Sequence, residues 1–294
     1  MKKDLNSRIY TPIFIMPALV LYFIFFIIPN VGGLFVGFTD WTTLYFKSPR
    51  FIGLDNFISM FSDPIFFKSI FNTFYYTIVT TILKVSLGLI FAVILNNKVK
   101  LTNLYRAIIF APIMMSTVVT GLIFSAIYHP EKGLLNVFLG KIGLEVLQQQ
   151  WLLDSKFAMN SICAMDVWMG TGMLMAIFLA GLQTVPKDFY ESATIDGASS
   201  RQMFFKITIP LIVPSITVNT SLGLISGLKV FGQVFVLTNG GPNDATQVVG
   251  TFLFKYFGQG MLGYTSAVGI VFTIFISLVS YFQIGTMRKK EVEM

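Results

Sequence analysis

The sequence of 294 residues is 54% hydrophobic and only 12% charged, and it contains 31 Phe residues. A soluble domain has roughly 25% charged residues, so these charges are too few to keep a globule of this size in water, and the expected solvent is a lipid bilayer. The net charge of +7 does not indicate nucleic-acid binding, because the basic residues flank apolar runs and form no patch with interleaved aromatic residues.

Six apolar segments each reach the length of about 20 residues that a helix needs to cross a bilayer. In chain order, the predicted spanning helices are residues 12–38, 69–95, 107–128, 157–182, 210–236 and 264–286. The first segment follows several basic residues, as the core of a signal peptide does, but its apolar run is too long and no small-residue cleavage site follows it. We therefore predict an all-α membrane protein with one transmembrane domain over residues 1–294.

The distribution of Lys and Arg predicts the orientation of these helices, because the cytoplasmic side of a membrane protein carries an excess of them. Most of the 21 Lys and Arg residues lie on the side of the two chain ends. These residues are Lys2, Lys3, Arg8, Lys98, Lys100, Arg106, Lys187, Arg201, Lys206, Arg288, Lys289 and Lys290. The loops on the other side, 39–68, 129–156 and 237–263, are longer, so their charges count for less. We expect both chain ends and the loop 183–209 to be cytoplasmic.

The second and fourth predicted helices carry charges at membrane depth, Lys84 and Asp166. A charge at this depth costs at least about 2.5–3.5 kcal/mol on insertion scales, so it normally faces the bundle interior or a wet cavity. Asp166 is therefore a candidate for lining a polar path, together with the aromatic face of Trp168. The alternative is that Lys84 and Asp166 pair with each other and only hold the helices together.

The loop 183–209 contains a predicted short helix. Pro186 suits its first turn, where a missing N–H costs nothing, and Asp188 and Glu191 place negative charge near its positive end. Gly197 is expected to end the helix, because Gly adopts the left-handed conformation that a helix end requires. The result is a helix of about three turns, roughly 15 Å long, at the membrane surface.

The predicted helix 210–236 has a polar stripe on an otherwise apolar surface. Asn219, Ser226 and Gln233 are spaced by seven, and Lys229 lies within about 80° of them at 100° per residue. The stripe either lines a substrate path or makes hydrogen bonds between helices. The same segment has residues that allow bending or close packing, namely Pro214, Gly223, Gly227 and Gly232.

The loop and the start of this helix resemble the signature of ATP-binding-cassette importer permeases, which reads E-A-A, three residues, G, nine residues, I-x-L-P. The matching residues here are Glu191, Ser192, Ala193, Gly197, Ile207, Ile209 and Pro210. Ser192 replaces the second Ala and Ile209 replaces Leu, and the spacing is kept throughout.

Shorter motifs extend the resemblance over nearly the whole chain. They are residues 51–57 (F-I-G-L-D-N-F), 133–136 (G-L-L-N), 180–183 (A-G-L-Q), 238–242 (T-N-G-G-P) and 263–267 (G-Y-T-S-A). Their order is similar to that in the carbohydrate branch of the family, in the permeases that resemble the larger maltose-type subunit. The chain lacks the extra helices and outer domain of that subunit, so it resembles a compact six-helix member.

The resemblance implies that the loop helix couples this chain to an ATPase. The coupling residues would be Phe189, Tyr190, Glu191, Ser192, Ala193, Gly197, Arg201 and Pro210. Phe189, Tyr190 and Ala193, at helical spacing, would form the packing face, and Gly197 the point of close approach. The implied partners are a second, homologous permease subunit, two cytoplasmic ATPase subunits that bind ATP and Mg²⁺, and an extracytoplasmic solute-binding protein. This chain itself would bind no cofactor.

The resemblance also implies a carbohydrate substrate, with an oligosaccharide preferred, moved by alternating access across a bacterial-type cell membrane. Sugar hydroxyls hydrogen-bond to polar side chains, and their C–H faces pack on aromatic rings. The expected path residues are Asn219, Ser226, Lys229, Gln233, Asp166 and Trp168.

Enzyme functions find no support in the sequence. The phosphate-binding motif G-x-x-x-x-G-K-[ST] is absent from it. The only histidine, His129, lies beside Pro130 in a predicted outer loop, so a serine nucleophile would lack a paired base. The single cysteine, Cys163, forms no intrachain disulfide, and no metal-ligand cluster is visible. Together with the resemblance to importer permeases, this predicts a transporter subunit and not an enzyme.

Two alternatives come from other functional classes. An ion-coupled or proton-coupled secondary transporter would show paired buried acids and an internal inverted repeat, and the sequence shows neither. A structural membrane scaffold would not require polar residues at membrane depth.

Overall fold

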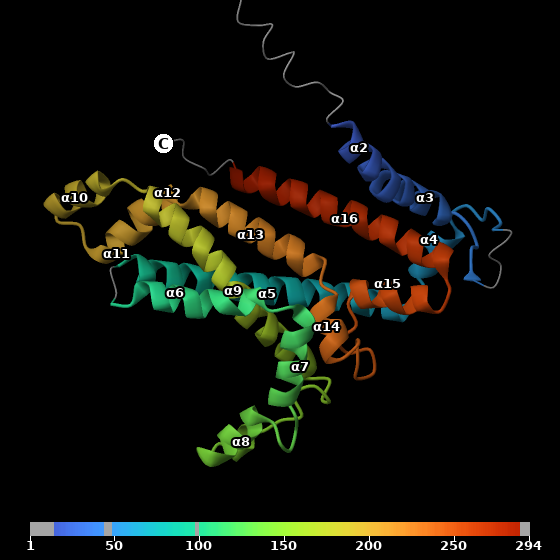
Figure 1. Cartoon of the computed structure of the whole chain (residues 1–294), viewed down its shortest axis with the longest axis horizontal. Helices are drawn as coiled ribbons and strands as arrows, with labels where there is room; N and C mark the ends of the chain where they lie inside the picture. Colours follow the sequence, from blue (N-terminus) through green and yellow to red (C-terminus); the bar gives the residue numbers. More distant parts are fainter. Residues whose placement is uncertain (1–14, 44–48, 98–99, 289–294) are drawn as a thin grey trace, which may run out of the picture. The chain divides into compact units, whose positions relative to one another are not determined.

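The computed structural model describes residues 15–43, 49–97 and 100–288, and helices form nearly all of the regular structure in these ranges (Figure 1). The first residues of the predicted helix 12–38 lie outside these ranges, as do the basic residues Lys2, Lys3, Arg8, Lys98, Lys289 and Lys290. The chain forms two compact units, which are Met1–Asp63 with Leu253–Thr273, and Pro64–Phe252 with Ile274–Met294.

The first unit contains one apolar helical segment and a short helix. The segment runs through α2 (Met16–Tyr22), the π-helical turn η2 (Phe23–Ile27) and α3 (Ile28–Val36), followed later by α4 (Asp55–Met60). Asn56 of α4 donates hydrogen bonds to the carbonyl oxygens of Gly37 at 3.0 Å and Thr39 at 2.8 Å. These bonds hold the turn that follows α3.

The second unit contains most of the helices. In chain order they are α5 (Pro64–Asn96), α6 (Thr102–Phe110), the 3-10 turn η4 (Ala111–Met114), α7 (Thr117–Ile127), α8 (Leu134–Lys141), the 3-10 turn η5 (Glu145–Leu147), α9 (Ala158–Thr184), α10 (Lys187–Ile195), α11 (Ser200–Met203), the π-helical turn η6 (Phe204–Thr208), α12 (Ile209–Leu211), α13 (Val213–Leu228) and α14 (Gly232–Leu237). Two helices, α15 (Val249–Gly258) and α16 (Leu262–Arg288), have residues in both units.

Several of these helices are suited to a membrane. Among the described residues, four helical segments are long and apolar enough to cross it alone: Met16–Val36, Pro64–Asn96, Ala158–Thr184 and Leu262–Met287. Two further pairs pass the same test together, Thr102–Met114 with Thr117–Ile127, bent by 100°, and Ser200–Leu211 with Val213–Leu228, bent by 67°. Up to six candidate spans result if each bent pair counts once, so the predicted all-α membrane class is confirmed.

The first bent pair differs from the continuous helix predicted over residues 107–128. Met115 has an extended backbone with ψ of 144°. The hydroxyl oxygen of Ser116 then accepts the N–H of Val119 at 3.3 Å. This N-terminal cap starts a new helix, α7, in a new direction.

The second bent pair differs from the continuous helix predicted over residues 210–236. Its first break is at Ile212, because Pro214 has no N–H to donate to the carbonyl four residues earlier. A second break at residues 229–231 separates α13 from α14. Gly227, a weak helix former, lies just before this break.

One face of α5 is polar and buried, although the helix is long enough to span a membrane. The residues of this face recur every three or four positions, and they are Asn72, Thr73, Tyr76, Thr77, Thr80, Thr81 and Lys84. The helices α9 and α13 pack against α5, with Gly223 against Thr81 and Gly227 against Thr77. Of the two roles expected for Gly223 and Gly227, bending or close packing, the structure shows close packing.

We expect Gly227→Ala to destabilise the second unit. An added Cβ would lie 2.8 Å from the Cα atom of Thr77, a backbone atom that cannot move aside without shifting α5. Overpacking of this kind costs about 1–3 kcal/mol, which thermal unfolding of the purified protein in detergent measures. Gly285→Ala in α16 is the matched control, because nothing lies within 4 Å of its added Cβ. Equal stability of both variants would contradict the close packing of α13 on α5.

Candidate functional site

The helix α10 has the ends that the sequence predicts, with one small difference. Pro186 is the N-terminal cap, with φ −61° and ψ 139°, and not a residue of the first turn. At the other end Gly197 has φ of +77°, in the left-handed region. Its N–H donates to the carbonyl oxygen of Thr194 at 3.1 Å, and the N–H of Ala198 donates to the carbonyl oxygen of Ala193 at 2.9 Å. This pair of bonds is a Schellman motif, so the predicted glycine stop is confirmed.

A second helical segment, Ser200–Leu211, follows α10 and is here called the arm. Ser199 starts it with a capping box, in which its backbone N–H donates to the Gln202 side chain at 2.8 Å and its hydroxyl accepts the Gln202 N–H at 3.3 Å. The arm contains the π-helical turn η6 and ends just before Val213, where α13 begins. It also carries two of the expected coupling residues, the exposed Arg201 and the partly buried Pro210.

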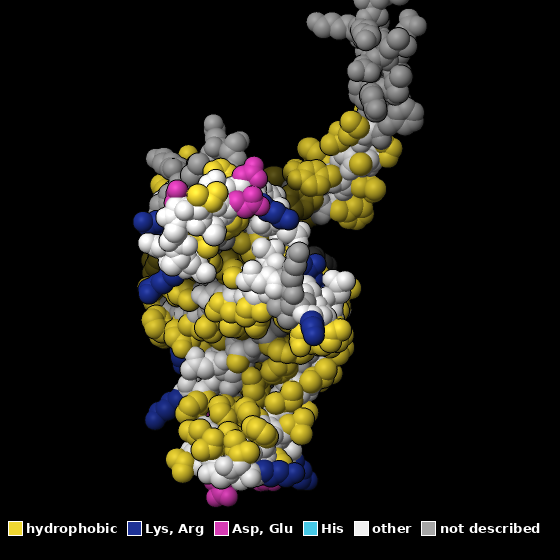
Figure 2. Space-filling model, turned by 90° about the vertical axis from the view of Figure 1, so that its left-hand side faces the viewer, with side chains coloured by type: hydrophobic (Ala, Val, Ile, Leu, Met, Phe, Trp, Pro, Cys, Tyr) yellow, Lys and Arg dark blue, Asp and Glu magenta, His cyan; other side chains and the backbone are white. Residues whose placement is uncertain are grey.

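The side chains of α10 divide into an outer and an inner set. Phe189 is 49% exposed and Ile195 is 87% exposed, and Glu191 and Ser192 are also exposed. Tyr190 and Ala193 are half-buried. The exposed residues of α10 and α11 include charges of both signs, namely Lys187, Asp188, Glu191 and Arg201. Figure 2 shows charged side chains of both signs on the side from which α10 faces the viewer.

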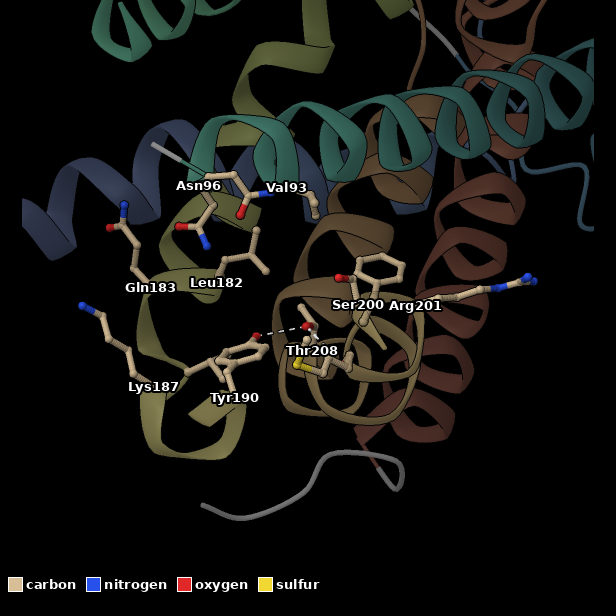
Figure 3. A pocket seen from close by; sticks show the side chains of 13 residues that line it. Val93, Asn96, Leu182, Gln183, Lys187, Tyr190, Ser200, Arg201 and Thr208 are labelled. Carbon is tan, nitrogen blue, oxygen red and sulfur yellow. Dashed lines mark hydrogen bonds between the residues drawn. The ribbon is translucent and has the colours of Figure 1, made fainter. Parts of the chain in front are cut away.

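Tyr190 differs from the expectation that it shares one outward face with Phe189 and Ala193. Its ring packs against a buried cluster that includes Leu182. Its hydroxyl lies 2.9 Å from the hydroxyl of Thr208 in the arm (Figure 3). The exposed apolar side chains of α10 are therefore Phe189 and Ile195. Ile195 was not among the expected coupling residues. Its signal in the sequence is a large apolar residue in a polar stretch, two residues before the helix stop at Gly197.

A hollow of about 790 Å³ lies between α10, the arm and the C-terminal ends of α5 and α9 (Figure 3). Its lining includes Asn96, Leu182 and Tyr190. Lys187 and Arg201 stand on opposite sides of it and their charged groups extend away from it. The hollow therefore does not gather positive charge.

At membrane depth, one buried ion pair joins the central helices. The Nζ of Lys84 in α5 lies 2.8 Å from Oδ2 of Asp166 in α9, and the side chains are only 6% and 7% exposed. The other carboxylate oxygen, Oδ1, accepts a hydrogen bond from the Gln233 amide in α14 at 3.1 Å. The alternative in which Lys84 pairs with Asp166 is confirmed, and Gln233 also bonds to the carboxylate.

The four residues of the predicted stripe do not share one helical face. The helix breaks at residues 229–231, so Gln233 belongs to α14 and turns toward Asp166. Asn219 is fully buried and donates to the Leu174 carbonyl of α9 at 3.3 Å. Ser226 and Lys229 are exposed near the end of α13. The spacing by seven assumed an unbroken helix, and that assumption was wrong.

Other residues singled out from the sequence have simple surroundings. Trp168 is 44% exposed, and its ring lies 5.3 Å from that of Phe124 in α7. Cys163 is free and buried. Within the described ranges, no group of three or more His, Cys, Asp or Glu side chains could hold a metal ion.

Comparisons with known proteins agree over most of the chain. The family described as binding-protein-dependent transport system inner membrane component matches residues 84–289. The multiple sugar-binding transport system permease protein MsmF of Streptococcus mutans is 34% identical over 283 residues, which are 95% of this chain and 95% of that protein. The trehalose/maltose transport system permease protein MalF of Thermococcus litoralis is 34% identical over 277 residues, 94% of this chain and 93% of that protein.

A solved structure has the same fold. A chain of a bacterial ABC transporter involved in the import of the acidic polysaccharide alginate superposes with a TM-score of 0.84. The alignment covers 98% of both chains at 24% sequence identity. At this identity the likeness concerns the fold alone.

We expect Asp166→Ala to destabilise the protein strongly, because it leaves Lys84 buried without its partner. Removing one partner of a buried ion pair costs about 3–5 kcal/mol. Replacing both, with Lys84→Met and Asp166→Leu, should recover most of this loss, as thermal unfolding in detergent measures. If the double variant loses no less stability than Lys84→Met and Asp166→Leu lose in sum as single variants, the two side chains are uncoupled.

Proposed function

This chain belongs to the binding-protein-dependent transport system inner membrane components, the permeases of ATP-binding-cassette importers, and from this membership we propose that it moves oligosaccharides. It is a multi-pass membrane subunit of the sugar type and not an enzyme. Two relatives at 34% identity are named as permeases of sugar transport systems. Membership in this family argues against the two alternatives, an ion-coupled secondary transporter and a structural membrane scaffold.

The proposed complex contains this chain and a second, homologous permease subunit in the membrane. Two cytoplasmic ATPase subunits bind ATP and Mg²⁺, and an extracytoplasmic solute-binding protein delivers the sugar. Both chain ends and α10 lie in the cytoplasm in this arrangement. The support is the family membership together with the excess of Lys and Arg on that side of the sequence.

The proposed coupling element is α10, with Glu191, Ser192 and Gly197 facing the ATPase. Its apolar contacts are Phe189 and Ile195, which are 49% and 87% exposed. A single exposed helix with two large apolar side chains suits a groove on a partner. Closure of the ATPase pair on ATP then displaces α10 and turns the bundle outward, and hydrolysis returns it to face inward.

The proposed sugar path runs beside Asp166, Trp168 and Gln233. Lys84 lies 2.8 Å from the Asp166 carboxylate, so each of these buried polar groups has a partner within the protein. Trp168 presents a half-exposed ring on which the C–H face of a sugar can pack. Of the other expected path residues, Asn219 and Ser226 lie on α13 and Lys229 directly follows it, and Ser226 and Lys229 are exposed.

The oligosaccharide proposal is tested by reconstituting the purified complex in lipid nanodiscs with its solute-binding protein. Maltotriose, raffinose, maltose, trehalose, glucose and glycerol 3-phosphate are then compared for stimulation of ATP turnover. The proposal expects an oligosaccharide to stimulate most. Stimulation by glucose or glycerol 3-phosphate alone would contradict it.

We expect Gly197→Asp to uncouple ATP turnover from sugar uptake. Burying an unpaired charge at an interface costs about 2–5 kcal/mol, so uptake in proteoliposomes should fall at least about tenfold. Gly143→Asp is the matched control, because Gly143 has φ of +76° against +77° for Gly197, and nothing lies within 4 Å of either added Cβ. The control places Asp in the same left-handed backbone conformation, but at a position outside the coupling loop 183–209. Unchanged uptake and sugar-dependent ATP turnover in Gly197→Asp would exclude the coupling role.

A further inference from the structure

The helix α10 is fastened to the arm mainly by one side chain. Apart from Tyr190 and Ala193, every residue of α10 is exposed. The Tyr190 hydroxyl lies 2.9 Å from the Thr208 hydroxyl. Thr194 also approaches the arm, but its hydroxyl lies 3.9 Å from the Met203 sulfur, which is a weak acceptor, and it donates to its own helix at 2.7 Å. Tyr190 therefore makes the stronger polar contact between the two segments.

The partner of this bond lies at a special place in the arm. Thr208 is the last residue of the π-helical turn η6, and its hydroxyl is also within 3.5 Å of the Met203 carbonyl. A Thr hydroxyl that donates to a carbonyl keeps its lone pairs free to accept the Tyr190 O–H. Single π-helical turns occur frequently at functional sites, because they interrupt the regular hydrogen-bond ladder.

The arm leads directly to the break in front of α13. The arm and α13 meet at 67°, with Ile212 between them. Ile212 is 1% exposed and belongs to the buried cluster against which the Tyr190 ring packs. A displacement of Tyr190 therefore acts on the arm through Thr208 and on the break through the cluster around Ile212.

The hollow of about 790 Å³ limits the direct contact of α10 with the ends of α5 and α9. It lies on the side of α10 that faces the ends of α5 and α9 (Figure 3). Where side chains leave such a space, helices do not push directly on one another. Tyr190 crosses the edge of this space to reach Thr208.

We propose that Tyr190 is a positioning residue of the transport cycle, whose bond to Thr208 transfers the movement of α10 to the arm and changes the bend at Ile212. This proposal rests on the proposed function of α10 as the contact with the ATPase. It separates two roles within one short helix. Phe189 and Ile195 face the partner, whereas Tyr190 holds the permease's own arm.

The experiment measures the angle between the arm and α13 in the complete complex, purified with its ATPase subunits. Spin labels are placed at Phe205→Cys in the arm and Leu222→Cys in α13, which are exposed positions. The native Cys163 is buried, so a chain without introduced cysteines gives the background. Pulsed electron paramagnetic resonance records the distance between labels without nucleotide and with ATP and vanadate.

We expect the labelled parent to show a nucleotide-dependent change of this distance. Tyr190→Phe and Thr208→Val, which each remove one hydroxyl of the bond, should keep the ATPase subunits bound and reduce the population of the changed distance roughly fivefold. Thr208→Ser keeps the hydroxyl and should retain the change. Thr194→Val removes a different hydroxyl from α10 and should also retain it.

Several results would overturn the proposal. One is that Tyr190→Phe and Thr208→Val both show the same nucleotide-dependent change of distance as the parent. The others are that Thr194→Val loses this change as much as they do, or that the parent itself shows no change. Loss of the ATPase subunits from Tyr190→Phe would make Tyr190 a docking residue instead. If no ATPase subunit purifies with the parent chain, the proposed function fails before any distance is recorded.

Discussion

The buried ion pair between Lys84 and Asp166 is the interaction on which the packing of the second unit depends. In a bilayer a charge must find its partner within the protein, so α5 and α9 must lie with these two side chains face to face. Gln233 completes the carboxylate's partners and thereby fixes α14 against α9. The remaining polar face of α5 is then covered by α9 and α13, with Gly227 allowing the backbones to approach.

The part of the chain outside this packed bundle obeys a different constraint. The helix α10 buries little of its surface within the described part of this chain, because all of its residues except Tyr190 and Ala193 are exposed. Its ends are fixed locally, by Pro186 at the start and by the left-handed Gly197 at the stop. Its position relative to the bundle depends on Tyr190, which joins the buried cluster and bonds to Thr208. A rigid helix on a single strong attachment is suited to transmit movement.

The sequence predicted the features that depend on local chemistry or on the cost of a buried charge. Gly197 was expected to be left-handed because a helix stop requires it. Pairing of Lys84 with Asp166 was one of the two alternatives, because a buried charge needs a partner. Features that depend on tertiary packing could not be predicted. Helical spacing does not say which face of α10 the chain covers, so Tyr190 was placed outward. Gln233 was placed on a stripe because the break at residues 229–231 leaves little trace in the sequence.

The mechanism requires that α10 meets an ATPase inside the cell. Ile195, 87% exposed at the end of this helix, is the position from which to test that contact. A photo-cross-linking amino acid incorporated at this position in intact cells, followed by mass spectrometry of the cross-linked product, gives the answer directly. We expect the product to contain a cytoplasmic ATPase subunit. A cross-link to an extracytoplasmic protein, or none to any ATPase, would contradict the account.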